Sequence, residues 1–280
     1  MATRREVLRT IGAAAAAAAL PGWPVPGGAD RLKKIGVQLY TVRDALKADF
    51  DGTLRKVAAI GYQEVEFAGY MGRTPAQVKA SLKTAKLSAP SAHLDLDSLE
   101  KDWAPTVEAA RTIGVEYLVV AWIDAARRAS IEDYKRIAGT FNRLGKQAKS
   151  AGLRFGYHNH AFEMASMDGQ VPYDVLLDNT DPELVCFEMD LYWTVDGGKN
   201  PLAYFAKYPG RFPLVHVKDR TAQGQMVDVG AGVIDWAAIF AHRKQAGIKH
   251  EFVEHDEPAD PFASIAASYA YLRALRFQDA

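Results

Sequence analysis

Four apolar stretches in the C-terminal half of the chain end in carboxylate, imidazole or ammonium side chains. Within the last three stretches these residues are spaced two apart, so each pair shares one face of an extended strand. Neighbouring strands lie about 5 Å apart, so the four ends can meet around one point. The residues are His158, His160 and Glu163 after the first stretch, Glu188 and Asp190 in the second, His216 and Lys218 in the third, and Glu254 and Asp256 in the fourth.

Charges buried together without partners are costly, and a shared cation removes that cost. Three carboxylates and one imidazole suit Mn²⁺, Co²⁺, Mg²⁺ or Zn²⁺, with coordination positions left open for substrate oxygens. The pattern therefore predicts one divalent metal ion as cofactor.

The elements that must position these residues alternate regularly along the chain. Glycine follows a helix-like segment and precedes a strand at four places, Gly61, Gly114, Gly152 and Gly247, which indicates one repeated unit. Strands are predicted at 35–41, 62–67, 87–93, 115–121, 153–160, 184–191, 213–218 and 249–255. Helices are predicted at 51–60, 75–86, 98–113, 131–151, 172–179, 200–208, 235–246 and 261–275.

Eight strand–helix units in this length predict an α/β protein with a single-domain (β/α)₈ TIM barrel over residues 31–280. The alternative is an open doubly wound sheet, but the first strand is followed by no Gly-x-Gly-x-x-Gly sequence. Active sites of such barrels lie at the carboxyl ends of the strands, which is where the acidic and imidazole residues occur.

Residues 1–30 have the pattern of a twin-arginine signal peptide and flexible leader. Arg4 and Arg5 precede a short alanine-rich run at 13–19, and prolines and glycines follow. We therefore expect an exported, periplasmic protein without a stable membrane anchor. The formal net charge of zero disfavours nucleic acid as a partner. A homo-oligomer is compatible with the sequence.

The whole pattern resembles the xylose isomerase-like barrel superfamily of sugar and sugar-phosphate isomerases and epimerases, over about residues 33–275. The DNA-repair branch of that superfamily has a histidine three residues after the strand-six aspartate, where this chain has Trp193. The segments that carry the resemblance are 36–43 (GVQLYTVR), 61–66 (GYQEVE), 157–163 (YHNHAFE), 190–193 (DLYW), 216–219 (HVKD) and 230–236 (GAGVIDW).

The resemblance implies a metal held by Glu, Asp, His and Glu from strands five to eight. Because Glu163 lies three residues past His160, the loop must fold it back, and His158 and His160 are the alternative ligands from that strand. The resemblance also implies that Glu163 and Glu254 form the acid/base pair. The implied ligands are Glu163, Asp190, His216 and Glu254.

The expected activity is a metal-dependent sugar isomerase or epimerase that removes a proton next to a carbonyl through a metal-stabilised enediolate. One alternative is a lyase or dehydratase that acts on a keto-sugar or 3-keto-glycoside by β-elimination, and another is a non-catalytic sugar-binding protein. Lys218 is expected to act on the substrate oxygen. The residues expected to bind substrate or to support the ligands are His158, His160, Trp193, His93, Tyr40, Arg43, Glu66 and Asp256.

Overall fold

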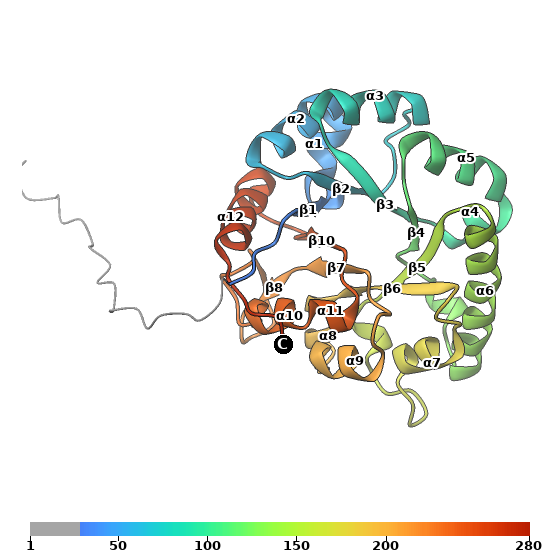
Figure 1. Ribbon diagram of the computed structural model, residues 1–280. Coiled ribbons are helices and arrows are strands. Elements are labelled where there is room, and N and C mark those ends of the chain that lie inside the picture. Colours follow the sequence, from blue (N-terminus) through green and yellow to red (C-terminus); the bar gives the residue numbers. More distant parts are fainter. Residues whose placement is uncertain (1–28) are drawn as a thin grey trace, which may run out of the picture.

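The computed structural model describes residues 29–280. Eight parallel strands close into a barrel in the order β1-β10-β7-β6-β5-β4-β3-β2, with helices around the outside (Figure 1). This confirms the predicted single-domain (β/α)₈ barrel. The strands are β1 (Gly36–Gln38), β2 (Glu64–Phe67), β3 (Ser88–Leu94), β4 (Tyr117–Val120), β5 (Arg154–His158), β6 (Val185–Asp190), β7 (Leu214–Val217) and β10 (His250–Val253).

Every predicted helical segment contains a helix, and two short helices, α1 and α8, were not predicted. The predicted end signals act as expected: Gly114, for example, adopts φ 101° directly after α5, a conformation that favours glycine. The helices are α1 (Arg43–Ala48), α2 (Phe50–Ile60), α3 (Pro75–Ala85), α4 (Leu96–Lys101), α5 (Trp103–Ile113), α6 (Ile131–Ser150), α7 (Pro172–Asn179), α8 (Leu191–Asp196), α9 (Pro201–Lys207), α10 (Trp236–Ala241), α11 (Arg243–Ala246) and α12 (Pro261–Ala274).

The strand at 87–93, which contains Pro90, forms as β3 (Ser88–Leu94). The pairing register between β2 and β3 shifts between Glu64 and Glu66, so Pro90 lies at an irregular point of the ladder. Proline has no N–H to donate and is tolerated at such irregularities. Pro90 still accepts a hydrogen bond from the backbone N–H of Glu116.

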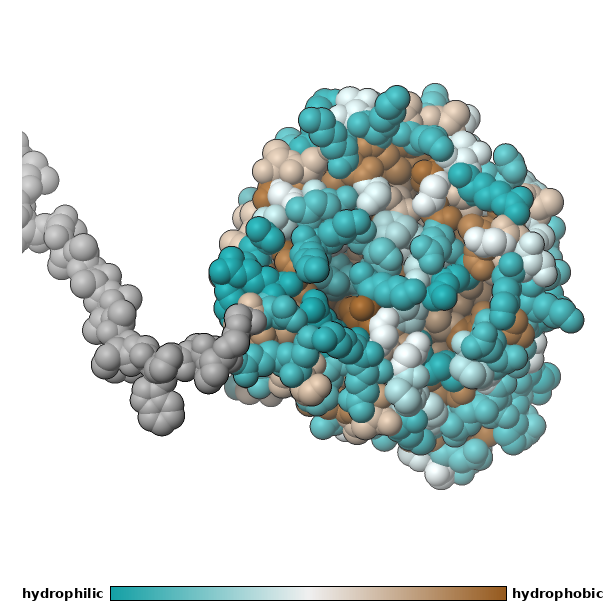
Figure 2. Space-filling view, viewed as in Figure 1, coloured by the Kyte–Doolittle hydropathy of each residue, from teal (hydrophilic) through white to brown (hydrophobic). Residues whose placement is uncertain are grey.

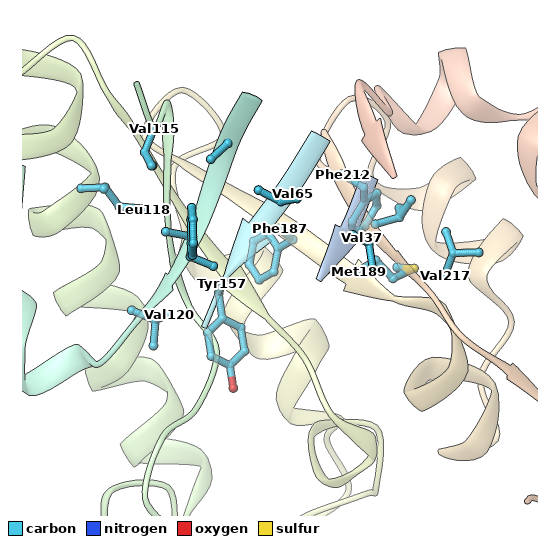
Figure 3. Close-up of a cluster of buried hydrophobic side chains, with 14 of the residues drawn as sticks. Val37, Val65, Val115, Leu118, Val120, Tyr157, Phe187, Met189, Phe212 and Val217 are labelled. Atoms are coloured by element: carbon cyan, nitrogen blue, oxygen red, sulfur yellow. The ribbon is translucent and has the colours of Figure 1, made fainter. Parts of the chain in front are cut away.

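Side chains alternate between the inside of the barrel and the layer of helices, as the period of two requires. The larger apolar cluster lies between strands and helices, and Figure 3 shows Leu118 and Val120 of β4 on the side of the strand that faces the helices. A smaller cluster, formed by Tyr117, Val119, Leu214 and Phe252 with Cys186 packed against it, fills the inside. Closer to the carboxyl ends of β6, β7 and β10, the inward-facing positions are occupied by polar residues of the predicted site.

Hydrophilic residues cover most of the face shown in Figure 2, with apolar surface in the recesses between them. Among residues 29–280, no helix combines the length and the apolar character needed to cross a membrane.

Candidate metal centre

Polar side chains from six strands meet inside the barrel, at the carboxyl ends of the strands. Glu66, His158, Glu188, Asp190, His216, Lys218 and Glu254 are all at least 94% buried, and His93 is partly exposed at the edge. Most of these residues were predicted to belong to the site. The sheet order explains their meeting, because β10, β7, β6 and β5 are consecutive neighbours in the barrel.

One group of possible ligands comprises His93, His158, Glu188 and His216, whose ligand atoms lie within 4.8 Å of one another. Glu188 Oε2 is at its centre, 2.6 Å from His93 Nε2, 3.1 Å from His158 Nδ1 and 3.3 Å from His216 Nε2. Glu66 Oε2 lies 2.6 Å from His216 Nε2, so the imidazoles of this group already have carboxylate partners.

The second group comprises Asp190, His216 and Glu254, also within 4.8 Å of one another. His216 Nδ1 lies 2.8 Å from Glu254 Oε2 and 3.9 Å from Asp190 Oδ2. His158 Nε2 lies 3.7 Å from Asp190 Oδ2, so His158 borders this group as well. The structure thus brings together three of the four residues implied as ligands.

Lys218 adds a buried positive charge beside the second group. Its Nζ lies 2.6 Å from Glu254 Oε2, 3.0 Å from Asp190 Oδ2 and 2.9 Å from Asp256 Oδ1. Burial alone would lower the pKa of Lys218, but the three carboxylates outweigh it and hold the pKa well above its usual range. Lys218 is therefore a fixed ammonium group.

The pKa shifts identify Asp190 as the carboxylate of the cluster whose burial is least compensated by positive charge. Burial raises the pKa of Asp190 to about 6, because Lys218 and His216 compensate for it only in part. In Glu188 and Glu254 burial acts in the same direction, but neighbouring cationic groups outweigh it and lower the pKa. Burial and the neighbouring His216 hold the pKa of His158 well below its usual range, so this imidazole is neutral and able to bind a metal.

Unpaired atoms in the cluster also fit a cation. Within residues 29–280, Asp190 Oδ2 and Glu188 Oε1 are buried side-chain oxygens without a hydrogen-bond donor. The ion-pair distance from Asp190 Oδ2 to Lys218 is short, but its geometry does not make a hydrogen bond. Buried carboxylate oxygens without donors are costly, and imidazole and carboxylate groups together form a typical divalent-metal donor set. The residues present therefore fit a divalent ion beside Asp190.

The structure does not bring Glu163 into either group of possible ligands. The residue lies in a short 3₁₀ turn, Ala161–Glu163, where its carboxylate accepts hydrogen bonds from the Tyr157 hydroxyl and from the backbone N–H of His160 at 2.8 Å. The turn thus holds Glu163 against the protein instead of folding it back to the cluster. Of the two alternatives on the same strand, His158 lies among the possible ligands and His160 does not.

A cavity of about 690 Å³ opens at this end of the barrel. Burial lowers the pKa of His160 to about 3, so this residue presents a neutral imidazole to the cavity. Trp193 lies further back, with its ring centroid 5.8 Å from the His160 ring and 5.7 Å from Lys218 Nζ. The predicted site residues that line the cavity are Tyr40, His93, His158, His160, Lys218, Glu254 and Asp256.

Arg43 and Glu66 do not line the cavity but contact residues that do or that belong to the cluster. The Arg43 guanidinium donates to the backbone carbonyls of Tyr40 and Asp256, at 2.9 and 2.8 Å, and thereby joins the first and last strand ends. Glu66 is fully buried and accepts hydrogen bonds from Gln38 and Ser91 as well as approaching His216.

Asp219 organises the loop that follows Lys218. Its carboxylate accepts hydrogen bonds from the backbone N–H groups of Gly230, Gly232 and Ile234 and from the indole of Trp236. A Cβ at Gly232 would come within 2.2 Å of the Asp219 carboxylate. Gly232 therefore allows the backbone to approach the protein's own carboxylate, whereas a Cβ at Gly230 would instead meet the Tyr271 ring.

Sequence analysis placed Glu188 among the converging strand ends but not among the ligands or substrate-binding residues, and it gave no site role to Trp122 or Asp219. The spacing of Glu188 and Asp190 was a usable signal, because two acidic residues on one inner strand face are expensive to bury. For Trp122, an aromatic residue directly after a strand gave no signal that separates a cavity wall from the core.

The chain belongs to the xylose isomerase-like TIM barrel family, whose model matches residues 54–275. It is 25% identical over 266 residues to inosose dehydratase 2 of Bacillus cereus, covering 81% of this chain and 88% of that protein. It is 28% identical to a sugar phosphate isomerase/epimerase of known structure from Parabacteroides distasonis, with a TM-score of 0.76, covering 90% and 96% of the two chains.

A more distant solved structure, the IOLI protein with a bound zinc atom, shares the fold. Its TM-score is 0.67 at 15% identity, and 86% of this chain and 95% of that chain are covered. Together, the family and the named relatives support assignment of the chain as an enzyme.

Proposed function

We propose that the chain is a divalent-metal-dependent lyase that acts on a keto-sugar or a related polyhydroxylated cyclic ketone. The observation that carries this proposal is that Glu254 lines the cavity, whereas Glu163 is held by Tyr157 and His160. An epimerase with two opposed glutamates needs both at the substrate. Elimination needs one carboxylate that takes a proton from carbon and gives it to the leaving oxygen.

Asp190, His216 and Glu254, joined by His158, would hold the ion. When bound there, a divalent cation polarises a carbonyl and makes the neighbouring C–H more acidic.

The protein's own groups supply the proton transfers. Both contacts of Glu254 with His216 and Lys218 use Oε2, so Oε1 is the oxygen we assign to the substrate proton. Glu254 takes the proton from the carbon beside the carbonyl, a carbon–carbon double bond forms, and the carbon–oxygen bond at the next carbon breaks. The same carboxyl then protonates the departing oxygen, which leaves as water or an alcohol.

Lys218 stabilises negative charge that develops on the substrate oxygen. Its ammonium is held in place by three carboxylates and lines the cavity. A preorganised charge of this kind needs little rearrangement during the reaction.

Relatives named inosose dehydratase support the elimination chemistry. The second candidate is a sugar isomerase or epimerase, which the name of the Parabacteroides distasonis structure favours. That reaction requires a group that returns the proton to carbon, and Asp256 on the cavity wall is the candidate for it.

The test is incubation of the Mn²⁺-loaded protein with inososes and 3-keto-glucosides in D₂O, followed by NMR. A lyase gives an unsaturated product, whereas an isomerase or epimerase gives a deuterated isomer. We expect Glu254→Gln to abolish product, and Glu108→Gln, at an exposed position of α5, to keep wild-type turnover. Sugar binding without product or deuterium exchange would favour a non-catalytic receptor and overturn the proposal.

We also propose that the chain is exported through its N-terminal segment. The twin-arginine signal predicted at 1–30 lies almost wholly outside the described residues, so the support is Arg4-Arg5 and the alanine-rich run that follows. Fractionation should find the wild-type protein in the periplasm. Replacing both arginines by lysine should retain it in the cytoplasm, and unchanged export would refute a twin-arginine signal.

A further inference from the structure

The charged residues of the cavity wall argue against a phosphorylated substrate. Of the cavity-lining side chains within residues 29–280, Lys218 is the one Lys or Arg, and it is already paired with three carboxylates. Asp95, Asp256 and Glu257 also line the cavity. A phosphate group held away from the metal would therefore face carboxylates and no free cation, which Coulomb repulsion disfavours.

A nearby helix end does not change this picture. The first turn of α4 begins beside the cavity at Asp95, but the Asp95 carboxylate itself accepts a hydrogen bond from the backbone N–H of Ser98. A carboxylate of the protein thus already accepts from this helix end, so the end is not available to a phosphate group.

Trp122 presents an aromatic surface on the same wall. It follows β4, is 52% exposed and lines the cavity. Its ring makes edge contacts with His160 and Phe162, at centroid distances of 5.1 and 5.3 Å. The Arg128 guanidinium packs on the Phe162 ring at 3.5 Å from its centroid and lies 5.5 Å from the centroid of the Trp122 ring. These contacts hold the indole in position.

Tyr40 is a second exposed aromatic residue at the cavity, on the turn after β1. It is 42% exposed, and the Arg43 guanidinium lies 4.1 Å from its ring centroid. In the barrel, β2 and β3 separate β1 from β4, so the two aromatic residues stand apart along the rim. The exposed large apolar side chains of residues 29–280 are Tyr40, Met71, Trp122 and Val233, and two of these four line this cavity.

We propose that Trp122 and Tyr40 form an outer subsite for an uncharged second ring, a sugar or aryl group joined to the reacting sugar by a glycosidic oxygen. The substrate class is then a non-phosphorylated glycoside. Aromatic faces pack on sugar and aryl rings without needing charge. Pockets of roughly 300–1,000 Å³ bind drug-sized ligands, and the cavity of about 690 Å³ has room for two rings. This inference rests on the proposed function, since the second ring would be the leaving group of the elimination.

The test measures binding alone, by calorimetry on the full Mn²⁺-loaded protein. The probes are glucose, phenyl β-D-glucoside and glucose 6-phosphate, none of which carries the ketone needed for reaction. We expect the phenyl glucoside to bind roughly tenfold more tightly than glucose, and glucose 6-phosphate to bind no more tightly than glucose. Trp122→Ala should remove most of the phenyl advantage, whereas Trp122→Phe should keep much of it.

Val233→Ala is the matched control, because Val233 is 58% exposed but does not line the cavity. Tighter binding of glucose 6-phosphate than of glucose would overturn the inference. The inference would also fail if phenyl β-D-glucoside bound no more tightly than glucose. It would fail too if Trp122→Ala, with an unchanged melting temperature, still bound phenyl β-D-glucoside more tightly than glucose by the wild-type factor. If the binding preference holds but no ketone substrate reacts, the proposed function fails and the subsite stands.

Discussion

The assignment of the strand-five ligand can be tested by replacing Glu163 with glutamine. In the structure this carboxyl is fully buried, and burial raises its pKa to about 8 despite hydrogen bonds from Tyr157 and His160. At pH 7 it is therefore mostly protonated, so glutamine replaces one neutral group by another. The amide oxygen can accept from the His160 N–H while the amide nitrogen donates to the Tyr157 oxygen, so the expected cost at pH 7 is within about 1 kcal/mol.

The pH dependence of stability gives the larger signal. Because the folded-state pKa of Glu163 is raised from 4.5, its protonation stabilises the fold fully below pH 4.5, and this contribution is lost as the pH rises to about 8. Converting that shift gives an upper limit of roughly 4 kcal/mol for the change in relative stability between pH 5 and pH 9. Glu163→Gln should therefore gain stability over the wild type as the pH rises, which urea unfolding at several pH values measures.

Metal content completes this test. Glu163→Gln should retain the divalent ion, measured by elemental analysis after dialysis and by titration with Mn²⁺. His158→Gln should weaken metal binding by at least roughly 100-fold, because a direct ligand contributes more than a supporting residue does. Loss of the ion from Glu163→Gln with normal binding in His158→Gln would refute this assignment and restore Glu163 as the ligand.

Three further results are expected. Saturation with Mn²⁺ at about 100 times its Kd should stabilise the wild type by roughly 2.7 kcal/mol, and Asp190→Asn should show little of this gain in thermal unfolding. Lys218→Met should lose roughly 3–5 kcal/mol of stability without metal, because it leaves buried carboxylates uncompensated; a melting temperature equal to that of the wild type in EDTA would contradict this. Burial raises the pKa of Glu251 to about 8, so its protonated form stabilises the fold at low pH and this is lost toward pH 8. Glu251→Gln should consequently raise the melting temperature at pH 8 more than at pH 5, with metal binding unchanged.

The inward faces of the late strands could be predicted because strand periodicity is a local property. His216 and Lys218, like Glu188 and Asp190, are two residues apart, and each pair lies inside the barrel as that spacing requires. The same reasoning could not choose partners within the cluster. The contact of His216 with Glu66 joins residues 150 positions apart, and that of His93 with Glu188 joins residues 95 apart.

The loop after β5 could not be predicted because its conformation depends on the side chains that pack around it. The spacing of His160 and Glu163 allowed the Glu163 carboxylate either to reach the metal site or to turn away from it toward Tyr157. The Tyr157 hydroxyl and the His160 backbone N–H, which accompany the 3₁₀ turn, hold it in the second position. Exposure of Trp122 likewise depends on how Phe162 and Arg128 pack beneath it.

The sequence by itself determined the eight strand–helix units, the helix ends and the strands that carry acidic and imidazole groups, because these follow from spacing and residue type along short segments. Tertiary structure alone decided how far each buried carboxylate is compensated by positive charge, that His158 rather than Glu163 lies among the possible ligands, and which aromatic residues reach the cavity. The physical reason is that burial and charge pairing depend on distances across the closed barrel, between groups far apart in the chain.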